Sequence, residues 1–310
     1  MQFKISTLFF YIFKWLVITI VIGACIGTAS AGFLISLDWV TNYRVNHLWL
    51  IAMLPIGGLL IGLLYHYYGK NVAAGNHLLL DTIHEPKAII PFKMAPFVYF
   101  GTMVTHLLGG SAGREGTALQ MAGAIADQFS KPFRLTNEER QILIIAAIAA
   151  GFGSVFGTPL AGAVFGLEVI LVRKFRYNTI FPAFVAAFFA DYITRAWNAP
   201  HTHYVVSLVP EISPTTLFYS IIAGIAFGLC AILFTQSLHR LTSFIANTIS
   251  FPPLRPFLGG ILIGCISAAY VQLIQLFARL SLQPLWLRIA LAGAITATVA
   301  IFIPEVMGVG

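Results

Sequence analysis

Several stretches of this chain are apolar over the length that a helix needs to cross a lipid bilayer, and this feature constrains the fold most strongly. A spanning helix needs about 20 consecutive, mostly apolar residues. The stretches that meet this requirement are Phe9–Leu37, Leu48–Tyr67, Ile180–Trp197, Thr216–Leu238, Leu258–Phe277 and Leu285–Ile303. The sequence therefore predicts an integral membrane protein, folded as a single transmembrane domain over residues 1–310.

The composition agrees with a protein whose surface faces lipid. Hydrophobic residues make up 58% of the 310 positions and charged residues only 9%, whereas soluble domains carry about 25% charged residues. The 18 Lys and Arg residues outnumber the 11 Asp and Glu residues, which gives a net charge of +7. In a membrane protein such an excess anchors cytoplasmic loops to anionic lipid. We therefore expect the bilayer, and no nucleic acid, as a partner.

The basic residues also predict the orientation of the chain. The first predicted loop, Asp38–His47, holds only Arg44 among Lys and Arg residues. Two later connections are richer in basic side chains: Lys70, Lys87 and Lys93 in one, and Arg173, Lys174 and Arg176 in the other. Basic loops stay on the cytoplasmic side, so we expect a multi-pass inner-membrane protein with a cytoplasmic N-terminus.

The region between residues 94 and 172 is apolar but interrupted. The interruptions are Pro96, the glycine cluster at 109–116, Gly151, Gly153, Gly157, Pro159 and Gly162. Irregular backbone at membrane depth is tolerated only where protein or a water-filled cavity surrounds it. Because transporters build their binding sites from such broken helices, the interruptions point to a transport site.

The glycine cluster leads into the motif Gly113-Arg114-Glu115-Gly116-Thr117, followed by a helix that we expect over about 117–129. A helix N-terminus presents free backbone N–H groups and the positive end of the helix dipole, so it attracts anions. Glycines at 113 and 116 allow close approach of an ion and a positive φ angle. The motif therefore predicts an anion-binding turn.

Glu115 lies inside this turn, and an ionisable residue at membrane depth is a functional candidate. As a carboxylate it competes with the anion for the same N–H groups, and once protonated it should swing aside. One side chain would then couple proton and anion movement. The alternative is that Arg114 and Glu115 form a structural ion pair.

These motifs resemble the CLC family of chloride channels and exchangers. Gly113–Thr117 resembles the family's GREGP signature, with Thr117 in place of the proline. Residues 151–162, GFGSVFGTPLAG, are similar to its AAFxAPLAG segment, which Phe165–Glu168 continues, and Gly75-Asn76-His77 falls where the family carries GSGIP. The match runs in order from residue 57 to about 180.

The resemblance implies an all-α fold of tilted and broken helices, built as two inverted repeats, and a homodimer with one ion pathway per subunit. Residues 1–200 would form the first repeat and residues 201–310 the start of an incomplete second one. The remaining segments of the family's ion site would lie beyond Gly310, so the chain is expected to be truncated at its C-terminus.

Asn76 and Thr117 make the chain similar to the branch of the family that exchanges fluoride for protons, as does the run from Asp81 to Pro86. Fluoride is strongly hydrated and needs close donors. Proline has no N–H, whereas threonine has an N–H and a hydroxyl, and asparagine brings two amide donors. Both residues are also good helix caps, and this alternative stays open.

We therefore expect fluoride export coupled to proton import through Glu115 in a bacterial inner membrane. The expected anion-binding residues are Gly75, Asn76, Gly113, Arg114, Gly116 and Thr117. The alternatives are a chloride channel or chloride/proton exchanger of the same family, or a truncated relative that does not transport. We expect no enzyme activity, because no nucleophile–base or metal constellation is found, and no cofactor.

Some residues have both a functional and a structural interpretation. His106 and Glu168 are candidates for a proton path; the alternatives are a hydrogen bond to a neighbouring helix for His106 and an ion pair with the following basic cluster for Glu168. No metal site is expected at His77, His84 and His106, because their spacing lacks a paired motif.

Small residues in the apolar segments predict close helix packing. They are Ala146, Ala147, Ala150 and Gly151 in one segment and Gly224 and Gly228 in another. Cys25, Cys230 and Cys265 are expected to pack as small core residues, and Thr158 with Pro159 is expected to begin a helix.

Overall fold

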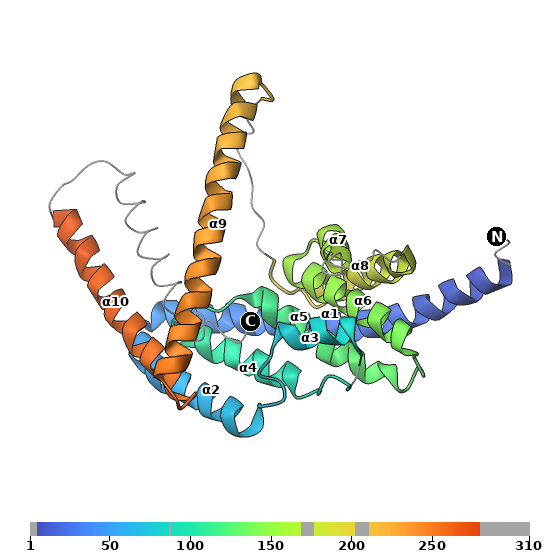
Figure 1. Ribbon diagram of the computed structural model, residues 1–310, viewed down its shortest axis with the longest axis horizontal. Coiled ribbons are helices and arrows are strands. Elements are labelled where there is room, and N and C mark those ends of the chain that lie inside the picture. The colour runs from blue at the N-terminus through green and yellow to red at the C-terminus, as the bar shows by residue number, and fades with distance from the viewer. Residues whose placement is uncertain (1–4, 87, 169–176, 202–210, 280–310) are drawn as a thin grey trace. The chain divides into compact units, whose positions relative to one another are not determined.

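The computed structural model describes residues 5–86, 88–168, 177–201 and 211–279. Within these ranges the regular elements are ten α-helices and three short 3₁₀ helices, with no strand (Figure 1). The predicted all-helical fold is thus confirmed for the described residues. The basic cluster Arg173, Lys174 and Arg176 and the predicted span Leu285–Ile303 lie outside them.

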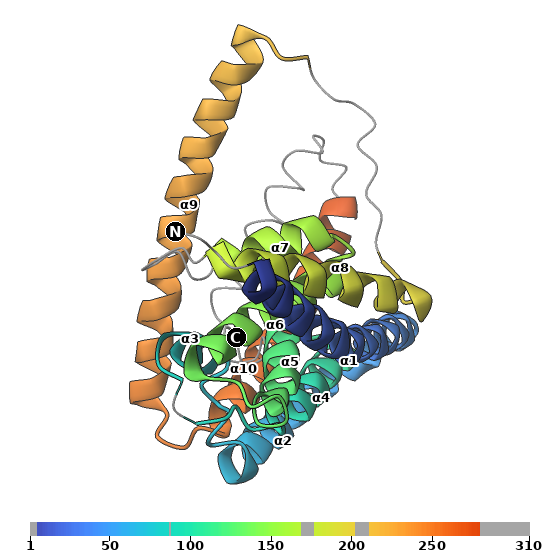
Figure 2. The same cartoon turned by 90° about the vertical axis from the view of Figure 1, so that its right-hand side faces the viewer.

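The described residues fall into two compact units. The first contains those between Met1 and Leu50 and between Leu63 and His201, and the second those between Ile51 and Gly62 and between Thr202 and Val306. All predicted site residues belong to the first unit. In that unit, helices α1, α4, α5 and α6 lie side by side (Figure 2).

Helix α1 runs from Ile5 to Asn46, so the predicted loop at Asp38–His47 is wrong. The polar residues at its end are satisfied within the helix: the Asn42 side chain donates to Asp38 at 3.0 Å. The rings of Trp39 and Tyr43 stack with centroids 5.7 Å apart. Side chains four residues apart on a helix are neighbours, and these pairs extend α1 past its apolar stretch.

The centre of the first unit is α6, Asn137–Phe156. Thr136 and Glu139 form a capping box at its start, and Gly157 ends it in the left-handed conformation at φ 67°. Each of these caps provides hydrogen-bond partners for backbone groups at a helix end that have none within the helix. Helix α6 packs against α1, α5, α7 and α8, so its ends and its faces are both fixed.

Small residues allow these helices to approach closely, as predicted. A Cβ atom on Gly151 would lie 2.8 Å from the carbonyl oxygen of Ala118 in α5. Helix α7, Pro159–Glu168, begins at Pro159 as expected, and a Cβ on its Gly162 would lie 2.5 Å from the backbone nitrogen of Gly153. The small-residue stripe of α6 is therefore a packing face.

The remaining helices of the first unit are short. They are α3 at Asn76–His84, α4 at Met94–Leu107, α5 at Arg114–Asp127 and α8 at Ile180–Ala196, with 3₁₀ helices at Gln128–Ser130 and Tyr177–Thr179. The predicted division of the region after residue 94 is confirmed at Gly109 and Gly157. It is wrong at Pro96, Gly151, Gly153 and Gly162, which lie inside helices. The predicted span Ile180–Trp197 is the 17-residue helix α8.

The second unit contains the second half of the 3₁₀ helix Leu48–Met53, the start of α2 at Leu54–Tyr68, α9 at Pro214–Thr248 and α10 at Leu254–Arg279. Glycines bring α2 and α10 together: a Cβ on Gly58 would lie 2.6 Å from the Pro256 carbonyl oxygen. The described helices long and apolar enough to cross a membrane are found in Phe9–Asn46, Leu48–Tyr68, Asn137–Phe156 and Pro214–Thr248.

Two predictions about small residues are wrong. Gly224 and Gly228 lie on α9, where no described neighbour comes within 4 Å of an added Cβ atom. All three cysteines are exposed rather than packed in a core. Apolar composition marks a residue as facing either protein or lipid, and it does not decide between the two.

Candidate functional site

The turn that enters α5 is built by the two glycines that follow α4. The N–H of Gly109 donates to the His106 carbonyl at 3.2 Å, and the N–H of Gly110 donates to the Thr105 carbonyl at 2.9 Å. Gly109 has φ 81°. This pair of bonds around a left-handed glycine is a Schellman motif, which ends α4 and turns the chain back.

Helix α5 begins at Arg114, three residues earlier than predicted, with Gly113 as its N-cap. Gly113 is extended (φ −75°, ψ 136°), and the positive-φ glycines are Gly75, Gly109 and Gly157. The expectation of positive φ at 113 and 116 is therefore wrong. The residues of the motif extend the helix because, in the absence of proline, each of them can adopt helical geometry.

No side chain caps the N-terminus of α5 among the described residues. The first backbone N–H groups of an α-helix have no partner within the helix, and here Gly113, Arg114, Glu115 and Gly116 supply them. The helix dipole adds positive potential at the same point. The start of α5 can therefore bind an anion.

Glu115 lies in the first turn, and its side chain is exposed. Its Oε2 atom lies 2.6 Å from the place that a Cβ atom on Gly113 would occupy, so the carboxylate folds back over the N-cap residue. A negative charge is stabilised at a helix N-terminus. The carboxylate thus occupies the neighbourhood in which an anion would be held.

Arg114 and Glu115 form no ion pair among the described residues, so the structural-pair alternative finds no support there. The guanidinium carbon of Arg114 lies 5.8 Å from the ring centroid of Phe156, within the range of a cation–π contact. Arg114 therefore packs on Phe156, the last residue of α6.

Thr117 is buried, and its hydroxyl is already occupied. It lies 2.6 Å from the hydroxyl of Thr102 in α4 and donates to the Gly113 carbonyl at 3.3 Å. Thr117 is not the helix cap. Its hydroxyl connects α4 to the N-cap residue, with Thr102 donating to Thr117 and Thr117 to Gly113.

His106 bonds to the same turn from the end of α4. Its Nε2–H donates to the carbonyl oxygen of Ala112 at 2.9 Å, and its side chain is half-buried. The structural interpretation predicted a bond to a neighbouring helix, whereas the partner is the turn before α5. His106, Thr102 and Thr117 together hold the last residues before α5 against α4.

Asn76 begins α3, with Gly75 as its N-cap at φ 56° and ψ −128° and without a side-chain cap bond. This φ lies in the region that favours glycine. The Oδ1 atom of Asn76 is buried without a hydrogen-bond partner in the described part of the chain. The capping alternative is therefore wrong for Asn76, and its amide is available to another group.

Helices α3 and α5 pack against each other. A Cβ atom on Gly123 in α5 would lie 2.5 Å from Cδ2 of Leu79 in α3. Leu79 follows Asn76 by about one turn, and Gly123 follows Glu115 by about two turns. The structure thus places both predicted groups of anion-binding residues on one pair of packed helices.

Glu168 stands apart from these residues. It is exposed at the end of α7, and the basic residues predicted to pair with it lie outside the described residues. No bond of Glu168 to the α3–α5 pair is present in the described part of the chain.

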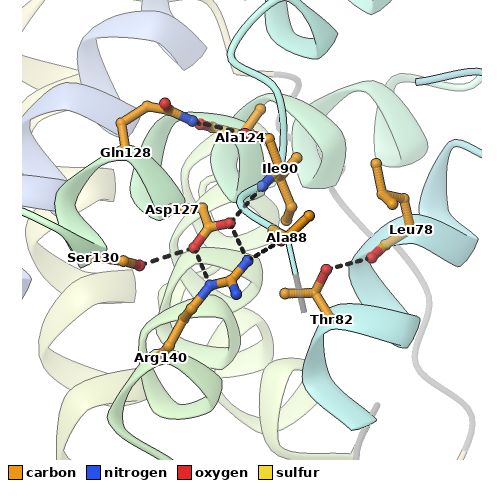
Figure 3. A network of polar contacts seen from close by, with 9 residues as sticks. All are labelled: Leu78, Thr82, Ala88, Ile90, Ala124, Asp127, Gln128, Ser130 and Arg140. Carbon is orange, nitrogen blue, oxygen red and sulfur yellow. Dashed lines mark hydrogen bonds and ion pairs between the residues drawn. The ribbon is translucent and has the colours of Figure 1, made fainter. Parts of the chain in front are cut away.

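Sequence reasoning missed three buried charged residues, namely Asp127, Arg140 and Asp191. Asp127 accepts from Arg140 Nε at 2.6 Å and from Arg140 Nη2 at 2.7 Å (Figure 3). Asp191 pairs with Arg195 at 2.8 Å. The signal was present, because each charge borders an apolar stretch, where ionisable residues are rare.

Residues 57–282 match the protein family that is described as "Voltage gated chloride channel". The chain is 50% identical over 253 residues to a "Chloride/fluoride channel protein" of Pseudomonas syringae pv. tomato, covering 82% of this chain and 56% of that protein. It is 27% identical over 236 residues to the H(+)/Cl(-) exchange transporter ClcA of Cronobacter sakazakii, covering 69% and 49%. The chain thus spans about half the length of these curated relatives.

Solved structures give a concordant result. A CLC-type fluoride/proton antiporter superposes with a TM-score of 0.84 at 26% identity, over all of this chain and 78% of that one. A slow cyanobacterial Cl-/H+ antiporter superposes with a TM-score of 0.78 at 21% identity, over 96% of this chain and 75% of that one. The second likeness concerns the fold alone.

Proposed function

The chain belongs to the voltage gated chloride channel family, and from this premise we propose that it carries part of the ion pathway of a halide transporter that exports fluoride in exchange for protons. Two relatives support fluoride as the halide. One is named a chloride/fluoride channel protein and is 50% identical, and the other is a fluoride/proton antiporter with the same fold. Chloride is the alternative substrate, in line with the more distant exchange transporter.

The observation that carries the proposal is the Glu115 carboxylate folded over Gly113 at the uncapped start of α5. The ionised carboxylate takes the place of an anion near the free N–H groups. Protonation removes its charge, so the carboxyl leaves and a halide binds to Gly113, Arg114 and Gly116 through their backbone. Loss of the proton then returns the carboxylate and expels the halide. Each halide that leaves is thereby linked to one protonation event.

Gly75 and Asn76 form the second part of the proposed site. Asn76 brings a side-chain amide with a buried oxygen that has no partner in the described residues. Fluoride is small and holds water tightly, so removing its hydration shell requires short contacts with several N–H donors. An amide that is not occupied by capping can turn its NH₂ group towards such an ion. Thr117 contributes through its bond to Gly113.

The proton path is proposed to include His106, which lies beside the turn, with Glu168 as a second candidate on the cytoplasmic side. We further propose that residues 1–200 form the first of two inverted repeats and 201–310 the start of the second. The assembly would be a homodimer in a bacterial inner membrane with its N-terminus in the cytoplasm. These proposals follow the family resemblance.

The test is transport by the natural full-length protein reconstituted in liposomes loaded with potassium fluoride or potassium chloride. We expect fluoride efflux with proton uptake, and Glu115→Gln should abolish the proton coupling because an amide cannot take up a proton. Glu138→Gln is the matched control, at an exposed glutamate outside the proposed site and proton path. Unchanged proton coupling in Glu115→Gln would remove Glu115 from the mechanism, and faster chloride than fluoride efflux would make chloride the substrate.

A further inference from the structure

We infer that Asp127, Gln128 and Arg140 are positioning residues of the proposed anion site, because they clamp the chain after α3 and so fix where α3 stands against α5. This inference rests on the proposed function. It concerns residues that lie at the opposite end of α5 from Glu115, and it assigns a role to buried charges that the gating scheme leaves unused.

The first step is the saturation of the Asp127 carboxylate, whose side chain is fully buried. It accepts from both Nε and Nη2 of Arg140 at 2.6 and 2.7 Å, from Ser130 Oγ at 2.8 Å and from the Ile90 backbone N–H at 2.7 Å. A carboxylate has about four lone-pair sites. Every one is therefore used, and one of the four donors comes from the connection between α3 and α4.

The second step is that two further hydrogen bonds hold the connection between α3 and α4. Arg140 Nη2 donates to the Ala88 carbonyl at 2.5 Å, and Gln128 Nε2 donates to the Ile90 carbonyl at 2.8 Å. Figure 3 shows Arg140 of α6 and Gln128 of the 3₁₀ helix after α5 beside Ala88 and Ile90. Three side chains thus hold irregular backbone, which has no helix of its own to satisfy its polar groups.

The third step links this clamp to the site. Helix α3 has only nine residues, and it packs on α5 through Leu79 against Gly123. The clamp grips the chain just beyond the other end of α3, and Gln128 also bonds to the Ala124 carbonyl at 2.8 Å. The chain is thereby held at two places, once by Leu79 within α3 and once by Ala88 and Ile90 after α3 has ended. Both contacts limit the movement of α3, and so of Asn76 at its start, relative to α5.

Such a device is useful because a binding site works only within narrow limits. Ligand groups must be held to within about 0.5 Å of the productive geometry, and a short helix held by a single contact can shift by more. Charged hydrogen bonds are shorter and stronger than neutral ones. A buried charge pair therefore suits the task of fixing α3 better than apolar packing alone.

The experiment compares three variants of the natural full-length protein by fluoride titration calorimetry and by hydrogen exchange of residues 76–84. Gln128→Met is nearly isosteric and removes only the bonds to Ile90 and Ala124. Asp127→Asn leaves Arg140 buried beside a neutral amide. The double variant Asp127→Leu with Arg140→Met removes both charges together, which restores stability where a buried pair is replaced by apolar groups.

We expect Gln128→Met to raise the fluoride Kd by about fivefold, the effect of losing the one of its two hydrogen bonds that reaches the connection after α3, and to speed hydrogen exchange in α3. The double variant should recover the melting temperature lost in Asp127→Asn and still bind fluoride weakly. A purely structural pair would recover both. Asp191→Asn is the control, because it removes the charge of another buried aspartate, which pairs with the half-exposed Arg195 away from α3, and should leave exchange in α3 unchanged.

Wild-type Kd values in both Gln128→Met and the double variant, with unchanged exchange in α3, would overturn the inference. The proposed function is tested separately by the unaltered protein. If that protein carries chloride instead, the same titration is run with chloride. If it binds neither halide, the proposed function fails, while exchange in α3 still reports whether Asp127, Gln128 and Arg140 hold it.

Discussion

Helices α6 and α9 have similar composition but opposite surroundings. Both are long and apolar enough to cross a membrane. In the most apolar 18 residues of α6, 78% are buried within the protein, whereas the corresponding stretch of α9 has no buried residue. Mean hydropathy does not predict which helix is buried, since it is higher for α9 than for α6. The more apolar helix is thus the more exposed one.

The side chains on the packed face of α6 and on the surface of α9 differ in size. The buried face of α6 carries Ala146, Ala147 and Ala150, all fully buried, and small residues let helix backbones approach. The surface of α9 exposes large side chains, among them Phe218, Ile225 and Leu233. Lipid is as apolar as leucine, so hydropathy reports only that a residue avoids water. Side-chain size does not decide the matter alone, because Gly224 and Gly228 on α9 have no neighbour in the described part of the chain.

The largest difference in stability between the two helices is expected when a charged side chain on each is replaced by an apolar one. Arg140→Met on α6 leaves Asp127 buried without its partner and should cost about 3–5 kcal/mol of stability. Arg240→Met on α9 changes an exposed residue and should stay within about 0.5 kcal/mol. Thermal unfolding in detergent measures both. Similar losses in the two variants would mean that α9 is packed in the natural protein.

Replacing one glycine by alanine on each helix should change the stability of the protein in opposite directions. Gly151→Ala on α6 brings a Cβ atom to 2.7 Å from Cβ of Ala122 and 2.8 Å from the Ala118 carbonyl. Overpacking of this kind costs about 1–3 kcal/mol. Gly224→Ala on α9 meets no described atom within 4 Å and should gain up to about 1 kcal/mol of helix propensity. A loss in Gly224→Ala would contradict the comparison, and the melting temperature reads out both signs.

The sequence predicted the features that depend on local chemistry. The bounds of α8 agree with the predicted span to within a residue, and Pro159 begins α7 because proline suits the first helical position. The extension of α1 to Asn46 was missed because Asp38 and Asn42 are polar, and their pairing is visible only once the helix is formed. The uncapped start of α5 was expected, and its register was not.

Contacts between distant residues could not be predicted in this way. The hydroxyl of Thr117 meets Thr102, 15 residues earlier, and Asp127 meets Ile90 and Arg140 on two other segments. No periodicity in one sequence reports which faces meet. Such pairs are decided by the packing of α4, α5 and α6, which is where the candidate site takes its shape.

Helices α6 and α9 each begin with a capping box. The two boxes therefore test whether a helix cap contributes equally to a buried and to an exposed helix. Thr136 with Glu139 caps α6, and Ser213 with Thr216 caps α9. Thr136→Ala and Ser213→Ala should each cost about 1 kcal/mol, because each leaves a helix N–H without its acceptor. A much larger loss in one of them, measured by thermal unfolding, would show that its cap also supports tertiary packing.

Hydroxyl groups give the finest comparison. On α6 the buried Ser154 bonds to Ser30 of α1 at 2.8 Å, whereas Thr235 on α9 bonds to its own helix at Ala231. Replacing Ser154 by Ala leaves the Ser30 hydroxyl without this partner, so the single changes should each cost about 1 kcal/mol. The double variant Ser30→Ala with Ser154→Ala should cost less than their sum, giving a coupling of about 0.5–1 kcal/mol. Thr235→Val should change stability by less than about 0.5 kcal/mol.

Additive losses in the two serine variants would mean that the hydrogen bond between α1 and α6 contributes nothing to stability. The contrast between hydrogen bonds that join two helices and those within one helix would then fail.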